Sequence, residues 1–194
     1  MRDDRTHWEE RYQSPAPNLA GAEPSAFLAQ QAAAIGGRVL DLACGTGRNS
    51  LFLARRGNRV DAIDIALGGL KQLQAIAAAE GLRINCVQAD LRSFELPENC
   101  YDAVINIRYL ERLLFPSMAR ALKPGGLLIF ETFLIDQQQF GHPRNPDFLL
   151  KHGELREAFQ SLDALHYDEG LVTAEKDASY MARLVARRPA LRDD

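Results

Sequence analysis

Three aspartates and one glycine-rich loop are the residues whose types and spacing could do chemistry. Asp41, Asp64 and Asp90 each end or follow an apolar run with strand character, and residues 43–47 after Asp41 read Ala-Cys-Gly-Thr-Gly. Glycines let a ligand approach the backbone closely, and a helix start beside them offers a positive field. An acid about twenty residues beyond such a loop can accept hydrogen bonds from ribose hydroxyls. The pattern predicts a site for a nucleoside-type ligand.

Each acid alone also has an ordinary structural explanation. Asp64 could cap a helix, Asp90 could be a turn residue, and Asp41 could hold the amides of the loop. The carboxyl ends of strands line the ligand crevice of an open parallel sheet, so we expect all three carboxylates to face one region. Their combination with the glycine loop favours a binding site over three unrelated structural roles.

The residues after the loop narrow the ligand class. A phosphate-binding Walker loop needs a Lys-Ser/Thr pair, whereas Arg48-Asn49 stands here. A dinucleotide loop uses a third glycine, and the corresponding position is Ser50. Carboxylates also repel a pyrophosphate. The sequence therefore favours a ligand without phosphates.

Alternating apolar runs and helical patterns must position these residues. Strands are expected at 39–42, 60–65, 84–88, 103–107 and 127–133, and helices at 3–13, 24–35, 51–56, 67–81, 115–122 and 154–159. Residues 136–146 read as a loop, and 162–167 and 179–187 as two strands with no helix between them, which pair antiparallel. The predicted fold is α/β, a doubly wound, mostly parallel seven-stranded Rossmann-like sheet with an antiparallel strand at the C-terminal end.

Composition limits the class of protein. The 194 residues, 46% hydrophobic with a net charge of −3, fit one domain over 1–194, in which 1–35 form an N-terminal helical lid or cap. Scattered basic residues argue against a nucleic-acid partner. Cys44, Cys86 and Cys100 lack metal-ligand spacing, so we expect reduced, buried thiols and no metal. The charged start and the absence of long apolar runs predict a cytoplasmic protein without membrane contact.

At this point the motifs resemble a known family. Residues 39–47 resemble motif I of the class I S-adenosylmethionine-dependent methyltransferases, with Ala43 in place of the first glycine. Asp64, Asp90-Leu91 and residues 101–104 and 122–126 follow in that family's order, so the resemblance covers about 36–133. Residues 45–51 and 148–156 are also similar to the tellurite-resistance (TehB-like) group of small-molecule methyltransferases.

The resemblance implies roles for matching positions, with S-adenosylmethionine as cofactor and S-adenosylhomocysteine as its product. Asp64 would bind the ribose hydroxyls, and Asp90, with the Leu91 amide nearby, would accept from the adenine amino group. Loop amides would approach the methionyl part, and His7–Tyr12 resembles a family lid that could lie over the sulfonium. The residues expected to bind the cofactor are Trp8, Tyr12, Asp41, Ala43, Cys44, Gly45, Gly47, Asn49, Asp64, Ile65, Asp90, Leu91, Asn106 and Arg108.

The sequence says less about the identity of the methyl acceptor than about the cofactor. A soft nucleophile needs no general base, whereas a hydroxyl or amine needs one. The expected catalytic residues are Glu131, Arg108, Tyr109 and His142, with Arg112 and Arg144 as further candidates. Glu131 stands out because an acid at the crevice end of a central strand has no obvious packing reason, while His142 beside Pro143 is typical of a solvated loop.

Several functions remain open on this sequence. The motif Asn/Asp-Pro-Pro-Tyr of amino-methylating enzymes does not follow the fourth strand, where Asn106-Ile107-Arg108-Tyr109 stands, so we expect a small-molecule acceptor. A thiol-like group or an oxyanion of the tellurite or selenite type would fit, on a monomer or homodimer. A methyltransferase acting on protein or nucleic acid is one alternative. A cofactor-binding protein without turnover is another, because Thr173-Ala174-Glu175 replaces the His-Arg pair of the tellurite enzymes.

Overall fold

The computed structural model describes residues 4–12, 19–173 and 178–190. The strands follow the order β3-β2-β1-β4-β5-β7-β6 in one seven-stranded sheet, which confirms the predicted Rossmann-like class. The chain divides into two compact units, residues 1–95 and 96–194. The expectation of a single domain stays a prediction, and we describe each unit by itself.

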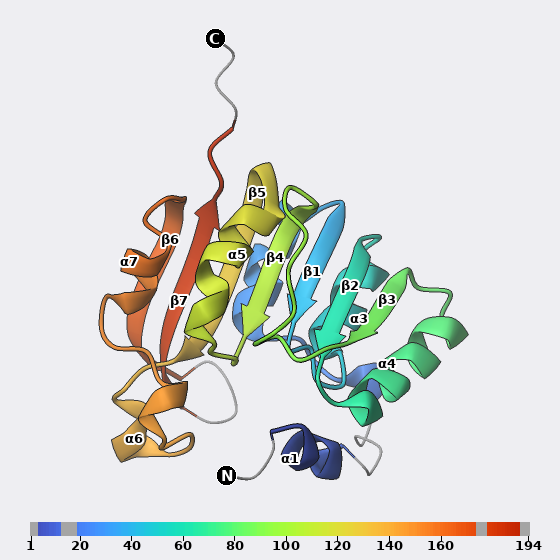
Figure 1. Ribbon diagram of the computed structural model, residues 1–194, viewed down its shortest axis with the longest axis horizontal. Helices are drawn as coiled ribbons and strands as arrows, with labels where there is room; N and C mark the ends of the chain where they lie inside the picture. Colours follow the sequence, from blue (N-terminus) through green and yellow to red (C-terminus); the bar gives the residue numbers. More distant parts are fainter. Residues whose placement is uncertain (1–3, 13–18, 174–177, 191–194) are drawn as a thin grey trace. The chain divides into compact units, whose positions relative to one another are not determined.

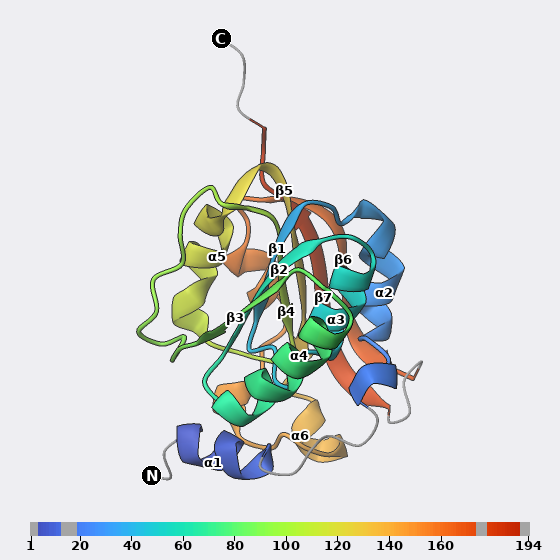
Figure 2. The same cartoon turned by 90° about the vertical axis from the view of Figure 1, so that its right-hand side faces the viewer.

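The first unit holds a parallel sheet covered by helices (Figure 1). Its strands are β1 (Arg38–Leu42), β2 (Arg59–Asp64) and β3 (Ile84–Gln88). Its helices are α1 (Asp4–Arg11), α2 (Ala26–Gln31), α3 (Arg48–Arg55) and α4 (Leu67–Ala79), with short 3-10 turns at Leu19–Gly21 and Ala32–Ala34. Figure 2 shows α3 and α4 packed beside β2 and β3, where they bury the apolar faces of these strands.

The second unit joins parallel and antiparallel strands. Its strands are β4 (Tyr101–Ile107), β5 (Leu122–Phe133), β6 (Asp163–Val172) and β7 (Ser179–Arg187). Its helices are α5 (Phe115–Ala121), α6 (Gln137–Phe140) and α7 (Glu154–Ala158), with 3-10 turns at Arg112–Leu114 and Pro146–Phe148. Strand β5 pairs with β4 in parallel, and β7 lies between β5 and β6, antiparallel to both. The strand that runs antiparallel to both of its neighbours, β7, therefore lies inside the sheet, and β6 is the edge strand.

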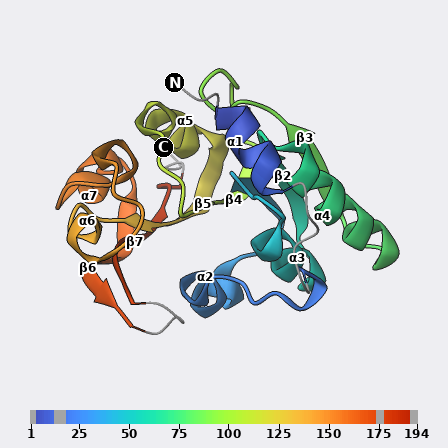
Figure 3. The same cartoon turned by 90° about the horizontal axis from the view of Figure 1, so that it is seen from below.

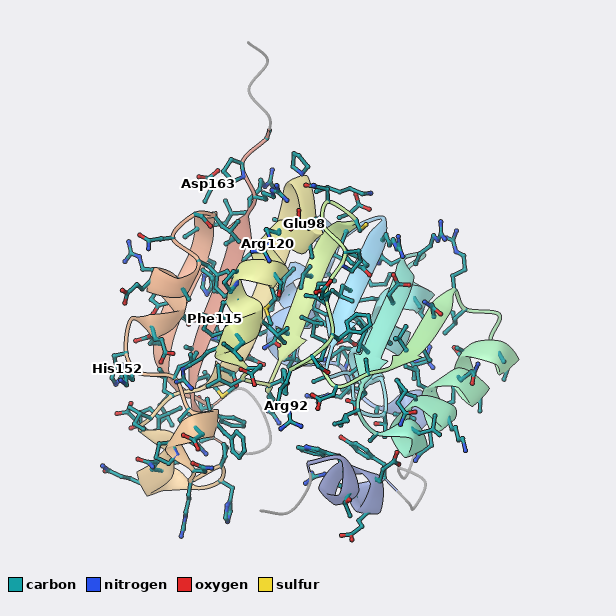
Figure 4. The ribbon with its side chains drawn as sticks, viewed as in Figure 1. Arg92, Glu98, Phe115, Arg120, His152 and Asp163 are labelled. Carbon is teal, nitrogen blue, oxygen red and sulfur yellow. The ribbon has the colours of Figure 1, made fainter. Side chains whose placement is uncertain are left out.

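Aromatic packing holds the helical face of the second unit. Phe115, at the start of α5 and marked in Figure 4, lies 5.7 Å from Phe130 of β5 and 5.2 Å from Phe159, measured between ring centroids. These distances are typical of favourable aromatic pairs. The three rings anchor α5 and the end of α7 on the sheet, with Phe130 itself fully buried.

Some predicted boundaries were wrong, and long-range pairing explains the one at the start of β5. Residues 123–126, expected to stop a helix, belong to β5 because the backbone of Arg188 pairs with Gly125 and Gly126. The predicted loop 136–146 contains α6. The helix predicted from residue 24 begins at Ala26, with Ser25 as its cap. Leu67, the first residue of α4, is 38% exposed. The expected chain break at 14–18 and residues 174 and 175 lie outside the described residues.

The thiol and membrane predictions were tested in part. Cys44, Cys86 and Cys100 are free, as expected, but each is only half-buried. Among the described residues, no helix has the length and apolar character needed to cross a membrane. No group of three or more potential metal ligands occurs in the described part of the chain.

Candidate functional site

The loop after β1 has a left-handed backbone at three positions. Ala43, Gly45 and Gly47 have φ angles of 52°, 59° and 85°. Glycine adopts this conformation without strain, whereas an L-residue such as alanine pays about 1–2 kcal/mol for it. Ala43 thus keeps the backbone shape that a glycine would have there, and the departure from the family motif leaves the loop geometry intact.

The same loop lies unusually close to the start of α4. A Cβ atom on Gly47 would come within 2.5 Å of the Leu73 side chain. A Cβ atom on Gly69 would come within 2.6 Å of the Gly45 carbonyl oxygen. Both contacts are shorter than real side chains allow, so only glycine fits at positions 47 and 69. The Gly68-Gly69 pair in the first turn of α4 therefore belongs to the site, although the sequence analysis did not single it out.

Asp64 ties this loop to the end of β2. Its Oδ2 accepts a hydrogen bond of 2.7 Å from the Gly45 amide, and its Oδ1 accepts one of 2.9 Å from the Ala66 amide. The residue is 6% exposed, and this burial raises its pKa. A carboxylate offers about four lone-pair positions, so both oxygens can still accept from a ligand hydroxyl.

Asp41 lies deeper, inside β1. It is 1% exposed, and its Oδ2 accepts a hydrogen bond of 2.5 Å from the Ser50 hydroxyl. Burial is the main cause that raises the pKa of Asp41 to about 7; the Ser50 hydrogen bond opposes this rise and the nearby Asp64 carboxylate adds to it. The Gly45 amide donates to Asp64 instead of Asp41, so the expectation that Asp41 holds the loop amides stays a prediction for the other amides.

The loop amides that were expected to face a ligand are engaged within the protein. The Cys44 amide donates to the Ile63 carbonyl at 3.0 Å, and the Gly47 amide donates to the Cys44 carbonyl at 2.9 Å. The Gly45 amide is taken by Asp64. These three amides are therefore not free donors for a ligand.

Asp90 follows β3 and forms an ion pair with Arg92, two residues further along the chain. The Arg92 guanidinium (Figure 4) donates to both carboxylate oxygens, at 3.0 and 2.7 Å, and the Arg92 amide adds a third hydrogen bond. These contacts lower the pKa of Asp90 and keep it an anionic acceptor. The next residue, Leu91, is buried, and Ile65 after β2 is half-buried. The sequence motifs did not indicate Arg92 as the partner of Asp90.

The side-chain oxygen of Asn49 is hydrogen-bonded within the protein. Its Oδ1 accepts a hydrogen bond of 3.0 Å from the Ser25 amide, and the Ser25 hydroxyl in turn accepts from the Leu28 amide. Asn49 thus fixes the entry into α2 at the first turn of α3. This use competes with the predicted role in cofactor binding.

Helix α1 brings two aromatic residues to the first unit. The Trp8 and Tyr12 rings stack with their centroids 5.9 Å apart, and the Arg11 guanidinium lies 5.4 Å from the centre of the Trp8 ring. A Cβ atom on Gly45 would lie 2.8 Å from the Tyr12 hydroxyl, so the hydroxyl touches the glycine loop. Burial, together with Asp64, raises the pKa of Tyr12 to about 12, which keeps the hydroxyl protonated as a donor.

In the second unit, a tight turn follows β4. Asn106 is fully buried, its Nδ2 donates to the Tyr109 carbonyl at 2.7 Å, and its Oδ1 has no hydrogen-bond partner among the described residues. Arg108 has a φ of 61°, an uncommon conformation for a residue with a side chain, and its guanidinium lies 5.8 Å from the Phe133 ring centre. A buried acceptor beside a strained residue is a common feature of ligand sites.

The two candidate bases have different surroundings. Glu131 is 3% exposed, and the strand register places it opposite Arg183 of β7, which pairs with Asp168 of β6 at 2.8 Å. The sequence analysis found no packing reason for Glu131 because it could not pair β5 with β7. His142 is exposed, and its backbone carbonyl accepts a hydrogen bond from the Gln137 side chain. Tyr109 is half-buried.

Arg112 has a structural role that the sequence did not indicate. Its guanidinium binds Glu154 at 2.5 and 3.0 Å and donates to the carbonyls of Asp147 and Leu149. It borders an open recess of about 530 Å³. Apart from Arg112 itself, no residue that lines this recess was expected to bind cofactor or act in catalysis. The recess is lined by Arg112, Pro146, Asp147, Lys151, His152, Glu154 and Glu157.

Comparisons with known proteins agree with the motif order. Residues 39–126 match the model of a family described as a methyltransferase domain. The chain is 32% identical over 112 residues to a ubiquinone biosynthesis O-methyltransferase of Nitrosococcus oceani, covering 55% of this chain and 48% of the relative. It is 30% identical over 142 residues to the probable S-adenosyl-L-methionine-dependent methyltransferase TehB of Haemophilus influenzae, covering 69% and 49%. The chain thus spans about half the length of these curated relatives.

Solved structures share the fold. The crystal structure of TehB from Haemophilus influenzae superposes with a TM-score of 0.75 at 22% identity, covering 96% of this chain and 67% of that one. An S-adenosylmethionine-dependent methyltransferase from Mesorhizobium loti gives a TM-score of 0.70 at 22% identity, covering 88% of this chain and all of the other. At this identity the likeness establishes the fold alone.

Proposed function

Since the chain belongs to the class I S-adenosylmethionine-dependent methyltransferases, we propose that it transfers a methyl group from S-adenosylmethionine to a small-molecule acceptor. The observation that supports this most directly is the hydrogen bond between the Gly45 amide and Asp64. It joins the glycine loop to an acid at the end of β2, where a ribose-binding carboxylate is expected in this fold.

The residues of the first unit fit the cofactor by their chemistry. S-adenosylmethionine supplies an electrophilic methyl group on a sulfonium sulfur. Asp64 would accept hydrogen bonds from the ribose hydroxyls, and Asp90, kept anionic by Arg92, would accept from the adenine amino group. The Tyr12 hydroxyl beside Gly45 offers a protonated donor to the amino-acid tail. The glycines of the loop leave the space that the Tyr12 hydroxyl and the Leu73 side chain occupy beside its backbone.

Two residues of the second unit were also expected to bind the cofactor. The buried Oδ1 of Asn106, which has no partner within the described part of the chain, can accept from a positively charged amino group, which suits the methionine end of the cofactor. Arg108 follows in the same turn, with its side chain over Phe133. These assignments rest on the order of the family motifs and on the chemistry of the two side chains.

The acceptor we favour is one that arrives as an anion or a soft nucleophile. Among the candidate bases, His142 is exposed in its loop and Glu131 is buried opposite Arg183, so neither offers the poised base that a neutral hydroxyl or amine requires. A thiolate or an oxyanion of the tellurite or selenite type needs only alignment and exclusion of water. The Nitrosococcus relative is an O-methyltransferase by name, which makes an acidic phenol the next class to test.

Turnover and binding together test this proposal. We would first measure S-adenosylhomocysteine binding by calorimetry, then transfer of labelled methyl from S-adenosylmethionine to panels of thiols, phenols, oxyanions, a mixed protein fraction and RNA. Methylation of a small thiol, oxyanion or phenol supports the proposal. Tight cofactor binding with no transfer to any acceptor would instead assign a binding role, and transfer confined to protein or RNA would assign a macromolecular acceptor.

A further inference from the structure

Helix α4 lacks a cap of its own. The residue before it is Ala66, whose side chain forms no capping hydrogen bond, and the first turn reads Leu67-Gly68-Gly69. The first four amides of an α-helix have no partner within the helix, so a polar side chain or water must satisfy them. The sequence offers no Ser, Thr, Asp or Asn at the capping position. A side-chain cap for α4 therefore has to come from a residue elsewhere in the chain.

Glu9 of α1 supplies that cap from 58 residues away. Its Oε1 accepts a hydrogen bond of 2.7 Å from the Leu67 amide, and its Oε2 accepts one of 3.1 Å from the Gly68 amide. A carboxylate at this position also complements the positive end of the helix dipole. The two bonds together fix both the position and the orientation of the Glu9 side chain relative to α4.

A second contact lies one turn along α4. The Gln72 Nε2 donates to the Tyr12 carbonyl at 3.1 Å. A Cβ atom on Gly68 would lie 3.1 Å from that carbonyl and 3.3 Å from Glu9 Oε2, so the missing side chain lets α1 settle onto the helix. Figure 3 shows α1 lying beside α4. The end of α1 is thus held at two points: Glu9 binds the first amides of α4, and the Tyr12 carbonyl binds the Gln72 side chain.

These contacts determine where the Tyr12 hydroxyl lies. Tyr12 follows directly after α1, and its hydroxyl touches the backbone of Gly45, whose amide is bound to Asp64. We propose that Glu9 is a positioning residue for cofactor binding: by clasping the start of α4 it holds the Tyr12 hydroxyl against the glycine loop. This inference rests on the proposed function, because the position of Tyr12 matters only if the loop binds the cofactor.

The test is a double-mutant cycle read out as the Kd for S-adenosylhomocysteine, measured by calorimetry on the full chain. We expect Glu9→Ala to weaken binding about tenfold, which corresponds to about 1.4 kcal/mol. Tyr12→Ala should weaken it by at least as much. If Glu9 acts through Tyr12, the double variant binds about as well as Tyr12→Ala alone, since residues that act as one unit are not additive.

Two further variants serve as control and backup. Glu10→Ala makes the same charge change on the same helix at an exposed position, and should leave the Kd within about twofold of the native value. Gln72→Ala removes the second contact and should weaken binding about threefold, again without effect in a Tyr12→Ala background. It keeps the test available if Glu9→Ala does not fold, which circular dichroism would reveal.

The outcomes separate this inference from the proposed function. If the native chain does not bind S-adenosylhomocysteine or S-adenosylmethionine, the proposed function fails. If it binds and Glu9→Ala binds equally well, only the positioning role is overturned. Additive losses in the Glu9→Ala, Tyr12→Ala variant would also overturn it, because Glu9 would then act independently of Tyr12.

Discussion

The Gly45 amide donates to Asp64 Oδ2 at 2.7 Å, so the loop after β1 and the acid that ends β2 form one hydrogen-bonded unit. The other oxygen of Asp64 accepts from the Ala66 amide at the start of α4. A single carboxylate therefore positions the three segments that surround the proposed nucleoside site, in addition to offering its own lone pairs to a ligand.

Asp64→Ala should weaken binding of S-adenosylhomocysteine by roughly ten- to a hundredfold. Hydrogen bonds to charged groups contribute about 1.5–3 kcal/mol, and the variant loses ligand contacts as well as the anchor of the Gly45 amide. Calorimetry gives the Kd directly. Asp61→Asn is the matched control, since Asp61 lies on the same strand but pairs with Arg38. Unchanged affinity in Asp64→Ala would contradict the ribose assignment.

Ala43→Gly should stabilise the protein by about 0.5–1 kcal/mol. The left-handed backbone at Ala43 costs an L-residue about 1–2 kcal/mol, and glycine removes this strain at an entropic cost of about 0.5–1 kcal/mol. Urea unfolding of both forms measures the difference. Ala89→Gly, in the loop after β3, should destabilise slightly because Ala89 has no such strain. A destabilised Ala43→Gly variant would show that the strain is compensated elsewhere.

The contribution of Asp41 to stability should fall as pH rises from about 4 to about 7. Its pKa is about 7 in the folded protein and about 4 when unfolded, so in this range the native state holds a proton that the unfolded state releases. The contribution reaches about 1.4 kcal/mol per pH unit and levels off above pH 7. Asp64, whose pKa is also raised, acts in the same direction.

Asp41→Asn isolates this effect. The amide mimics the protonated carboxyl and can still accept from Ser50, so the free energy of unfolding should depend less steeply on pH between 5 and 7. Denaturant unfolding at several pH values measures the slope. Asp163→Asn, at an exposed position of β6, should keep the native slope. Identical slopes in Asp41→Asn and the native chain would rule out Asp41 as the titrating group.

Glu131→Gln should reduce turnover by about tenfold or more while leaving the Kd for S-adenosylhomocysteine within about twofold. Glu131 lies in the second unit, buried opposite Arg183, and the variant removes its charge without changing its size. Asp168→Asn removes the other carboxylate opposite Arg183, at a more exposed position, and should affect turnover less. A large loss of cofactor affinity with normal turnover would move Glu131 to the cofactor side.

Local patterns explain which elements could be predicted. Strands β3 and β7 have the predicted bounds, and β1 and β2 agree within one residue, because short apolar runs between turn residues are encoded locally. Strand β5 was predicted five residues too short, since the pairing of Gly125 and Gly126 with Arg188 joins segments about 60 residues apart in the chain.

By itself, the sequence determined the strand–loop–helix order, the acids at the strand ends and hence the family and its cofactor, because these depend on neighbours a few residues apart. Tertiary structure decided which partner each side chain has: Asp64 instead of Asp41 on the Gly45 amide, Arg183 opposite Glu131, and Glu9 on the start of α4. Hydrogen bonds and strand register between distant segments depend on how the chain folds back on itself, and no local spacing encodes them.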